Sequence, residues 1–201
     1  MQAEFWNNRY LSHETVYGDL PNAFFKQCLE NLHIGRLLLP AEGEGRNAVY
    51  AATLGWEVTA FDYSHTAREK ALKQAKSKDV SLSYEICDFL SYIAPNQSMD
   101  AVALIYAHIP PETRPTFHQK IANWVKPGGH VMLEAFNPLQ LGLTSGGPKE
   151  LNMLYTPDML MTDFPDSEWD ITMLKTLETE LNEGPFHQGK AQIIRLLARR
   201  R

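Results

Sequence analysis

The sequence has little of what marks several large classes of protein. Its 201 residues include only two cysteines, Cys28 and Cys87, in no CxxC pair, so neither a disulfide framework nor a cysteine zinc site is expected. The seven histidines show neither HExxH nor HxxxH spacing, and we predict no metal site. No apolar run approaches membrane-spanning length, and the first ten residues lack the basic start and apolar stretch of a signal peptide.

An excess of positive charge is missing as well. The chain has 19 basic and 24 acidic residues, a formal charge of −5, which argues against a broad nucleic-acid-binding face. Hydrophobic residues make up 44% and charged residues 21%, as in ordinary soluble globular proteins. We therefore expect a single cytoplasmic domain over residues 1–201, a monomer or homodimer with no membrane or nucleic-acid partner. The basic end "ARRR", 198–201, is interpreted as a solvated tail.

What the sequence does have is an alternation of short apolar runs with amphipathic ones between residues 36 and 136. This alternation is typical of strands followed by helices. Strands are predicted at 36–41, 56–61, 81–86, 99–108 and 130–136, and helices at 46–55, 64–78 and 110–125, with a turn at 126–129.

Apolar strands that alternate with helices imply a parallel sheet covered on both faces, and right-handed crossovers then give a doubly wound, Rossmann-like α/β fold. Two long β-leaning runs, 169–184 and 189–200, favour a final antiparallel hairpin at the sheet edge. The predicted fold is thus a seven-stranded, mostly parallel sheet. Helical structure in parts of these runs stays open, since Leu and Glu are good helix formers.

The loop "PAEGEGRNA", 40–48, follows a predicted strand and opens a predicted helix. It matches G-x-G-x-x-[GA] from Gly43 to Ala48, and Asp62 follows at the end of the next strand. An acid at that place can accept hydrogen bonds from both hydroxyls of a ribose. The pattern therefore predicts a site for a ribose-bearing cofactor.

Two acids in this loop, Glu42 and Glu44, bear on the choice of cofactor. A pyrophosphate needs bare N–H groups at a helix start, and like charges 4 Å apart cost about 4 kcal/mol even at an effective dielectric constant of about 20. S-adenosylmethionine has no phosphate and carries an ammonium and a sulfonium, so the acidic loop favours it over a dinucleotide. The alternative is that both glutamates point to solvent and only the glycine turn matters.

The loop and the motifs after it resemble those of class I S-adenosylmethionine-dependent methyltransferases. The resemblance covers nearly the whole chain and looks closest to the TehB-like, tellurite-resistance group, which is related to thiopurine methyltransferases. Against the usual "vLDlGcGeGRNa", the chain reads "LLLPAEGEGRNA". The matching residues are Gly43, Gly45, Arg46 and Asn47.

Two residues depart from that motif. Leu39 stands where the family has an acid, and Ala41 stands where it has a glycine. Glu42 is placed to substitute for the missing acid, and we state this as a hypothesis.

The resemblance implies further cofactor contacts. Asp62, with Tyr63 and Ser64 beside it, is the ribose acid, and "CDFLSY" places Asp88 and the backbone N–H of Phe89 at the adenine. Ala107 and His108 then lie next to the bound cofactor at the outlet of the fourth strand.

The N-terminal flank "FWNNRYLSHETVYGDLP" is similar to the opening of this methyltransferase group. Arg9 can pair with the methionine carboxylate, and Tyr17 or Trp6 can close over the sulfonium. For Trp6, packing against a helix is the alternative, and for Arg9 the alternative is a surface salt bridge. We accordingly divide the chain into cofactor-covering helices (1–35), a cofactor-binding core (36–136), and a lid segment with the C-terminal hairpin (137–201).

The methyl acceptor is expected beyond the carboxyl ends of the strands. Candidate catalytic residues are His108 and, from the resemblance, His187 and Arg195 near the hairpin. For His187 and Arg195 the alternative is an exposed residue without a role. The acceptor is expected to be a small molecule, either an oxyanion of a chalcogen or a thiol or other small nucleophile. An NAD-dependent oxidoreductase and a non-catalytic S-adenosylmethionine-binding protein remain as alternative functions.

Overall fold

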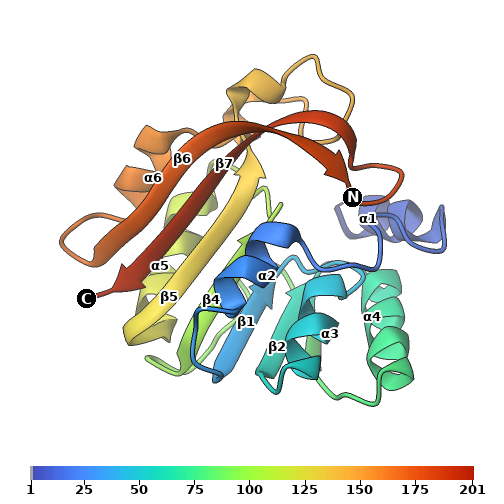
Figure 1. Ribbon diagram of the computed structural model, residues 1–201, viewed down its shortest axis with the longest axis horizontal. Helices are drawn as coiled ribbons and strands as arrows, with labels where there is room; N and C mark the ends of the chain where they lie inside the picture. Colours follow the sequence, from blue (N-terminus) through green and yellow to red (C-terminus); the bar gives the residue numbers. More distant parts are fainter. Residues whose placement is uncertain (1) are drawn as a thin grey trace.

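The computed structural model describes residues 2–201 and contains one seven-stranded sheet with the order β3-β2-β1-β4-β5-β7-β6 (Figure 1). The first five strands run parallel, and β7 pairs antiparallel with both β5 and β6. This confirms the predicted fold class, including the C-terminal hairpin. The strands are β1 Arg36–Pro40, β2 Glu57–Asp62, β3 Ser83–Ile86, β4 Met99–Ile105, β5 Val125–Phe136, β6 Trp169–Asn182 and β7 Gln188–Arg200.

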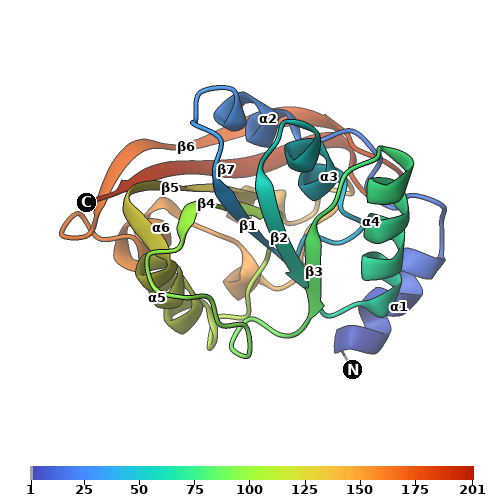
Figure 2. The same ribbon diagram turned by 90° about the horizontal axis from the view of Figure 1, so that it is seen from below.

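Helices cover both faces of the sheet, as Figure 2 shows. Helices α2 (Ala23–Leu29), α3 (Arg46–Thr53) and α4 (His65–Ser77) lie on one face, and α5 (Arg114–Trp124) and α6 (Pro157–Asp163) lie on the other. Because both faces are covered, the central strands are apolar throughout. In β1, for example, Leu37, Leu38 and Leu39 are all 0% exposed.

Apart from shifts of one to three residues at the ends of several elements, three local predictions differ from the structure. Helix α5 begins at Arg114 with Pro115 in its first turn, four residues later than predicted, because 110–113 form a turn. The predicted turn at 126–129 is part of β5, where the pairing with β4 is irregular. The basic end is not a solvated tail: Arg200 lies in β7, its guanidinium donates to Ala122 O and Glu168 O, and it packs over Trp169.

The N-terminal region divides into two parts. Helix α2 buries Phe24, Phe25, Cys28 and Leu29 against the sheet, so it belongs to the helix layer rather than to a cofactor cover. Helix α1 (Gln2–Leu11) lies beside α4, and residues 12–22, which we call the strap, run from α1 to α2 (Figure 1).

The turn between β6 and β7 reaches the strap. The hairpin arches across the top of the molecule toward α1 (Figure 1). Gly184 in the turn has φ +89, and a Cβ there would lie 2.5 Å from the backbone nitrogen of Gly18. Only glycine fits this close backbone approach, so the strap and the hairpin turn meet at the carboxyl ends of the parallel strands.

Candidate functional site

The glycine loop is shaped by packing between two helices. Gly45 is the N-cap of α3 with φ +88, and a Cβ there would lie 2.5 Å from the Ala71 Cβ of α4. Gly43 has φ +65, and a Cβ there would lie 2.6 Å from the Tyr10 hydroxyl. Both glycines are therefore required by backbone conformation and close contacts.

Glu42 caps helix α3 from within the loop. Its Oε1 accepts hydrogen bonds from the backbone nitrogens of Asn47 and Ala48, both at 2.8 Å. Burial raises the pKa of the Glu42 carboxyl to about 7, while the Ala48 N–H and the Arg46 charge act in the opposite direction. Leu39, where the family motif has an acid, is 0% exposed in the core. The geometry thus shows Glu42 as a helix cap, and its role as a substitute for that acid stays a hypothesis.

Glu44 holds the strap. Its carboxylate pairs with Lys70 Nζ at 2.7 Å and accepts from the backbone nitrogens of Val16 (2.7 Å) and Tyr17 (3.4 Å). Lys70 Nζ also donates to three backbone carbonyls of 10–14. The alternative that both loop glutamates point to solvent is therefore wrong, because each is buried against a partner inside the chain.

Asp62 lies at the carboxyl end of β2, directly beside the glycine loop. Its carboxylate accepts from the backbone nitrogens of Gly43 (3.1 Å) and Ser64 (2.9 Å), and burial raises its pKa to about 6. Ser64 is the N-cap of α4, and Tyr63 packs edge-on against Phe89 at 5.7 Å. Asp62, the predicted ribose acid, thus lies with Tyr63 and Ser64 at the carboxyl end of β2, beside the glycine loop.

The predicted adenine residues lie on the next loop. Asp88 is exposed, and its carboxylate accepts from the backbone nitrogens of Leu90 and Ser91 and from the Ser91 hydroxyl. The Ser91 hydroxyl is the largest cause that lowers the pKa of Asp88. Phe89 is buried. Asp88 therefore shapes its own turn, and its contact with adenine stays a prediction.

His108 ties the lid segment to the sheet. Its Nδ1 lies 2.8 Å from the Met153 carbonyl oxygen, and its Nε2 lies 3.3 Å from the Phe136 backbone nitrogen. Burial lowers the pKa of the ring to about 4. Both nitrogens are thus used within the chain, which favours a structural role over the predicted catalytic one. Ala107, the preceding residue, is buried, and its carbonyl accepts from the Tyr155 hydroxyl at 3.1 Å.

Aromatic rings of α1, the strap and the hairpin turn gather over the loop. Trp6 stacks on Tyr10 with ring centroids 5.7 Å apart, and Tyr10 meets Tyr17 edge-on at 6.3 Å. The Arg9 guanidinium lies 4.3 Å from the centre of the Phe186 ring. Within residues 2–201, Arg9 forms no ion pair, so its charge is available to a carboxylate.

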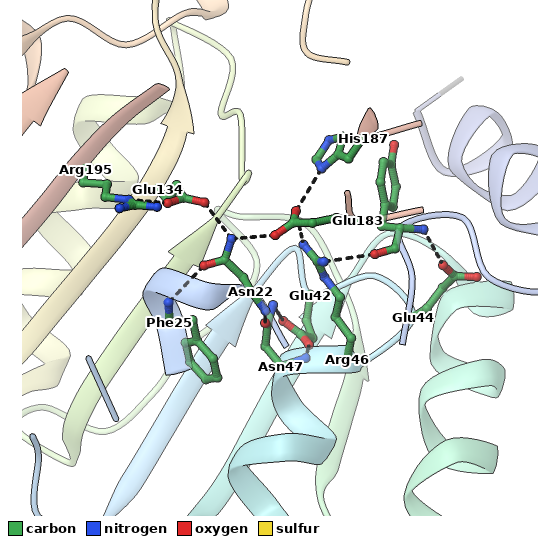
Figure 3. Close-up of polar contacts among 11 residues, drawn as sticks. Asn22, Phe25, Glu42, Glu44, Arg46, Asn47, Glu134, Glu183, His187 and Arg195 are labelled. Atoms are coloured by element: carbon green, nitrogen blue, oxygen red, sulfur yellow. Dashed lines mark hydrogen bonds and ion pairs between the residues drawn. The ribbon is translucent and has the colours of Figure 1, made fainter. Parts of the chain in front are cut away.

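A polar network joins the strap, α3, β5 and the hairpin (Figure 3). The Asn22 amide donates to both Glu134 (2.6 Å) and Glu183 (3.0 Å). Arg195 pairs with Glu134 at 2.5 Å, and Arg46 pairs with Glu183 at 2.9 Å and donates to the Tyr17 carbonyl. His187 Nδ1 lies 3.4 Å from Glu183 Oε2, and the His187 ring is 6% exposed. Each of these two arginine–glutamate pairs is neutral in charge.

The network borders a cleft of about 450 Å³ between the strap and the hairpin. Its walls are residues 17–23 and 179–184 together with Thr15, Arg46, Glu134 and Arg195. A cavity of about 410 Å³ between α6 and β6 contains none of the predicted site residues. Of the predicted residues, the cleft brings together Tyr17, Arg46 and Arg195, whereas Asp62 and Asp88 lie outside its lining.

Three further residues of the site, Asn22, Lys70 and Tyr106, match no motif that would identify them in the sequence. Asn22 is the N-cap of α2 and bonds two distant acids, and Lys70 looks like one of several lysines on an amphipathic helix. Tyr106 directly follows β4 and has φ +53, and its ring centroid lies 4.8 Å from that of Phe136 and 4.5 Å from that of His187. A non-glycine residue in this conformation is strained, and such strain clusters at functional sites.

No group of three or more His, Cys, Asp or Glu side chains in residues 2–201 could hold a metal ion. In the same range, no helix has the length and apolar character needed to cross a membrane.

Comparisons with known proteins agree with this architecture. Residues 40–129 match the family described as Methyltransferase domain. No curated protein sequence matches the chain significantly. Many solved structures are similar in fold, and the three described next are each below 20% identical to this chain.

The first structure concerns the conversion of a disulfide bond into a thioacetal group during echinomycin biosynthesis (16% identity, TM-score 0.80, 100% of this chain and 92% of that one). The second is TehB from Haemophilus influenzae (15%, 0.74, 100% and 67%). The third is magnesium protoporphyrin IX methyltransferase from Synechocystis PCC 6803 with bound S-adenosylhomocysteine (16%, 0.68, 89% and 80%). Residues 40–129 thus match a methyltransferase domain, and the chain shares the fold of solved S-adenosylmethionine-dependent methyltransferases.

Proposed function

We propose that the chain transfers the methyl group of S-adenosylmethionine to a small-molecule nucleophile. The observation that carries this proposal is the capping of α3 by Glu42. A dinucleotide would place its pyrophosphate at the first N–H groups of this helix. Two of those groups, on Asn47 and Ala48, are already taken by the Glu42 carboxylate. The anion site is therefore filled by the chain itself, which disfavours the NAD-dependent alternative.

The residues at the carboxyl edge fit S-adenosylmethionine instead. Asp62 supplies an acceptor for ribose hydroxyls, and the Arg9 guanidinium is available for the methionine carboxylate. The aromatic rings of Trp6 and Tyr17 suit a sulfonium, whose positive charge is attracted to ring faces. When bound, this cofactor supplies a methyl group already activated by its sulfur leaving group. The chain then has to align the acceptor with that methyl group and exclude water.

Two classes of methyl acceptor are candidates. A chalcogen oxyanion and a thiol or other small nucleophile both suit a fold of this size, and the assignment to the TehB-like group stays a prediction because 15% identity with TehB is a likeness of fold. Sulfur as the nucleophile agrees with the echinomycin structure, which concerns a disulfide and a thioacetal. A protein that binds the cofactor without catalysis is the remaining alternative.

Titration calorimetry with S-adenosylmethionine, S-adenosylhomocysteine and NADH tests the proposal. We expect both S-adenosyl compounds to bind and NADH not to bind. Asp62→Asn should weaken their binding about 10- to 100-fold, since hydrogen bonds to charged groups contribute about 1.5–3 kcal/mol. Asp170→Asn removes an exposed carboxylate from β6 and should change nothing. Binding of NADH without S-adenosylmethionine would contradict the proposal, and a methyl-release assay separates an enzyme from a binding protein.

A further inference from the structure

The His187 imidazole is enclosed at the carboxyl ends of β4 and β5. Its ring centroid lies 4.6 Å from that of Tyr17, 4.5 Å from that of Tyr106 and 5.4 Å from that of Phe136. A Cβ at Gly146 would lie 2.7 Å from His187 Cδ2 and 3.2 Å from its Nε2. The strap, the sheet and the lid segment therefore all contact this ring, next to the residues proposed to hold the cofactor.

One carboxylate faces this ring, and it is fixed from several sides. Glu183 Oε2 lies 3.4 Å from His187 Nδ1 and accepts from Arg46 at 2.9 Å, while Oε1 accepts from Asn22 at 3.0 Å (Figure 3). A carboxylate opposite Nδ1 places the ring proton on that nitrogen. Nε2 then presents a lone pair, and it has no hydrogen-bond partner among the described residues.

Burial favours the neutral form of the His187 ring. Burial is the largest cause that lowers the pKa of His187, and the Arg46 charge adds to it, whereas Glu183 and Glu134 raise it. The other titratable groups against the ring are His108 and the Tyr17 and Tyr106 phenols. A neutral imidazole whose Nδ1 proton is held by a carboxylate can take a second proton at Nε2, because Glu183 stabilises the resulting cation.

The same network is unsuited to an anion. Each of its two arginines is paired with a buried carboxylate, Arg46 with Glu183 and Arg195 with Glu134. An oxyanion entering here would lose its hydration beside two carboxylates, without an unpaired cation in the network to replace it. The unpaired Arg9 is assigned above to the cofactor carboxylate.

From these observations, and resting on the methyl transfer proposed above, we propose that His187 and Glu183 form a proton-accepting pair. The pair serves a small nucleophile that still carries its proton at neutral pH, a thiol or a hydroxyl compound, and not an oxyanion. A bond forms between the nucleophile and the methyl carbon, the methyl–sulfur bond breaks, and its electron pair stays on sulfur. The proton of the nucleophile passes to His187 Nε2 and later to water. Glu183 is the positioning residue of the pair.

Two acceptors that differ in acidity test this assignment. 2-Mercaptoethanol is a thiol that is mostly protonated at neutral pH, whereas 4-nitrothiophenol is already ionised and needs no base. We expect His187→Ala to slow methylation of 2-mercaptoethanol about 100-fold or more, because general-base catalysis contributes about 10²–10⁴. The rate with 4-nitrothiophenol should stay close to that of the wild type. Sodium selenite should not be methylated.

Glu183→Gln should slow methylation of 2-mercaptoethanol and leave that of 4-nitrothiophenol unchanged. Glu178→Gln removes an exposed carboxylate from the same hairpin and should slow neither reaction. A readout independent of turnover is the ¹⁵N NMR spectrum of the imidazoles with S-adenosylhomocysteine bound. It should show a neutral His187 protonated at Nδ1, and Glu183→Gln should lower the pKa of that ring.

Three results would overturn the proposal: equal losses for both thiols in His187→Ala, methylation of selenite in preference to thiols, or a His187 ring protonated at Nε2. Transfer to none of these compounds, with S-adenosylhomocysteine bound normally, would overturn the acceptor class and leave the proposed cofactor intact. Failure of S-adenosylhomocysteine to bind would instead contradict the proposed function itself.

Discussion

Replacing Lys70 by methionine should detach the strap from the cofactor side of the molecule. The ammonium of Lys70 donates to the carbonyls of Tyr10 (2.5 Å), His13 (2.7 Å) and Glu14 (3.0 Å) and pairs with Glu44 at 2.7 Å. Methionine keeps the apolar stem and removes all four interactions. Glu44, whose side chain is 8% exposed, then loses its cation and keeps only the N–H groups of the strap.

The free-energy cost of Lys70→Met depends on how far the Lys70 side chain is exposed. Breaking a fully buried ion pair costs about 3–5 kcal/mol, but a quarter of the Lys70 side chain is exposed, and the carbonyls of His13 and Glu14 can bind water instead. We therefore expect about 2–3 kcal/mol, which corresponds to about 30- to 150-fold in the equilibrium for opening the strap.

Hydrogen exchange of the Val16 and Tyr17 amides measures this opening directly, since both donate to Glu44. The protection of these two amides against exchange should fall about 30- to 150-fold, while the protection of amides in β1 and β4 should fall less. Lys73→Met is the matched control, because Lys73 is an exposed residue of the same helix. If Val16 and Tyr17 exchange equally fast in wild type and Lys70→Met, the strap is held by its aromatic packing, and the reasoning from Lys70 is refuted.

Three further predictions concern stability. Gly45→Ala should lower the free energy of unfolding in urea by about 2–4 kcal/mol, through overpacking on Ala71 and a positive φ, whereas Gly142→Ala, with the same φ and nothing within 4 Å, should cost about 1 kcal/mol. Burial raises the pKa of Glu42 from its ordinary value of 4.5 to about 7 in the folded state. The folded state therefore binds an extra proton between these values, and this contribution to stability is lost as pH rises from about 4.5 to 7. Glu42→Gln should remove that part of the pH dependence; the comparison with wild type is needed because His108, with a lowered pKa, acts in the opposite direction. His108→Phe leaves the Met153 carbonyl and the Phe136 N–H without a partner, and limited proteolysis should then cut within 141–152 faster than in wild type, while equal rates would contradict the anchoring role.

The strands and the mostly parallel sheet were predictable because apolar runs follow from burial on both faces. Leu37–Leu39 in β1 and Val102–Leu104 in β4 have no polar residue, since helices cover both sides of each strand. Asp62 was placed at the loop by the same logic, because strand length and parallel direction bring the end of β2 beside the end of β1.

The roles of the loop acids could not be predicted, because their partners are set by tertiary structure. Glu44 meets Lys70 from α4 and the backbone of the strap, and no spacing in the sequence marks either contact. The sequence predicts that the charge of Glu42 faces a ligand, whereas hydrogen bonds to N–H groups five and six residues later already satisfy this carboxylate. The sequence predicts His108 beside the cofactor as a candidate catalytic residue, because nothing in it shows that Met153 folds back onto this ring.

The contacts that complete the network between strap and hairpin join residues very far apart in the chain. Asn22 and Glu183 are separated by 161 positions, Arg46 and Glu183 by 137, and Asn22 and Glu134 by 112. Contacts of such separation form late and slow folding, because the chain between them must first be ordered. During synthesis from the N-terminus, the parallel strands can pair before β6 and β7 have been made, but the position of His187 cannot be fixed until the hairpin has closed over the strap. Truncation or misfolding of the last 20 residues would therefore leave a sheet with its glycine loop and Asp62 and without the proposed proton-accepting pair.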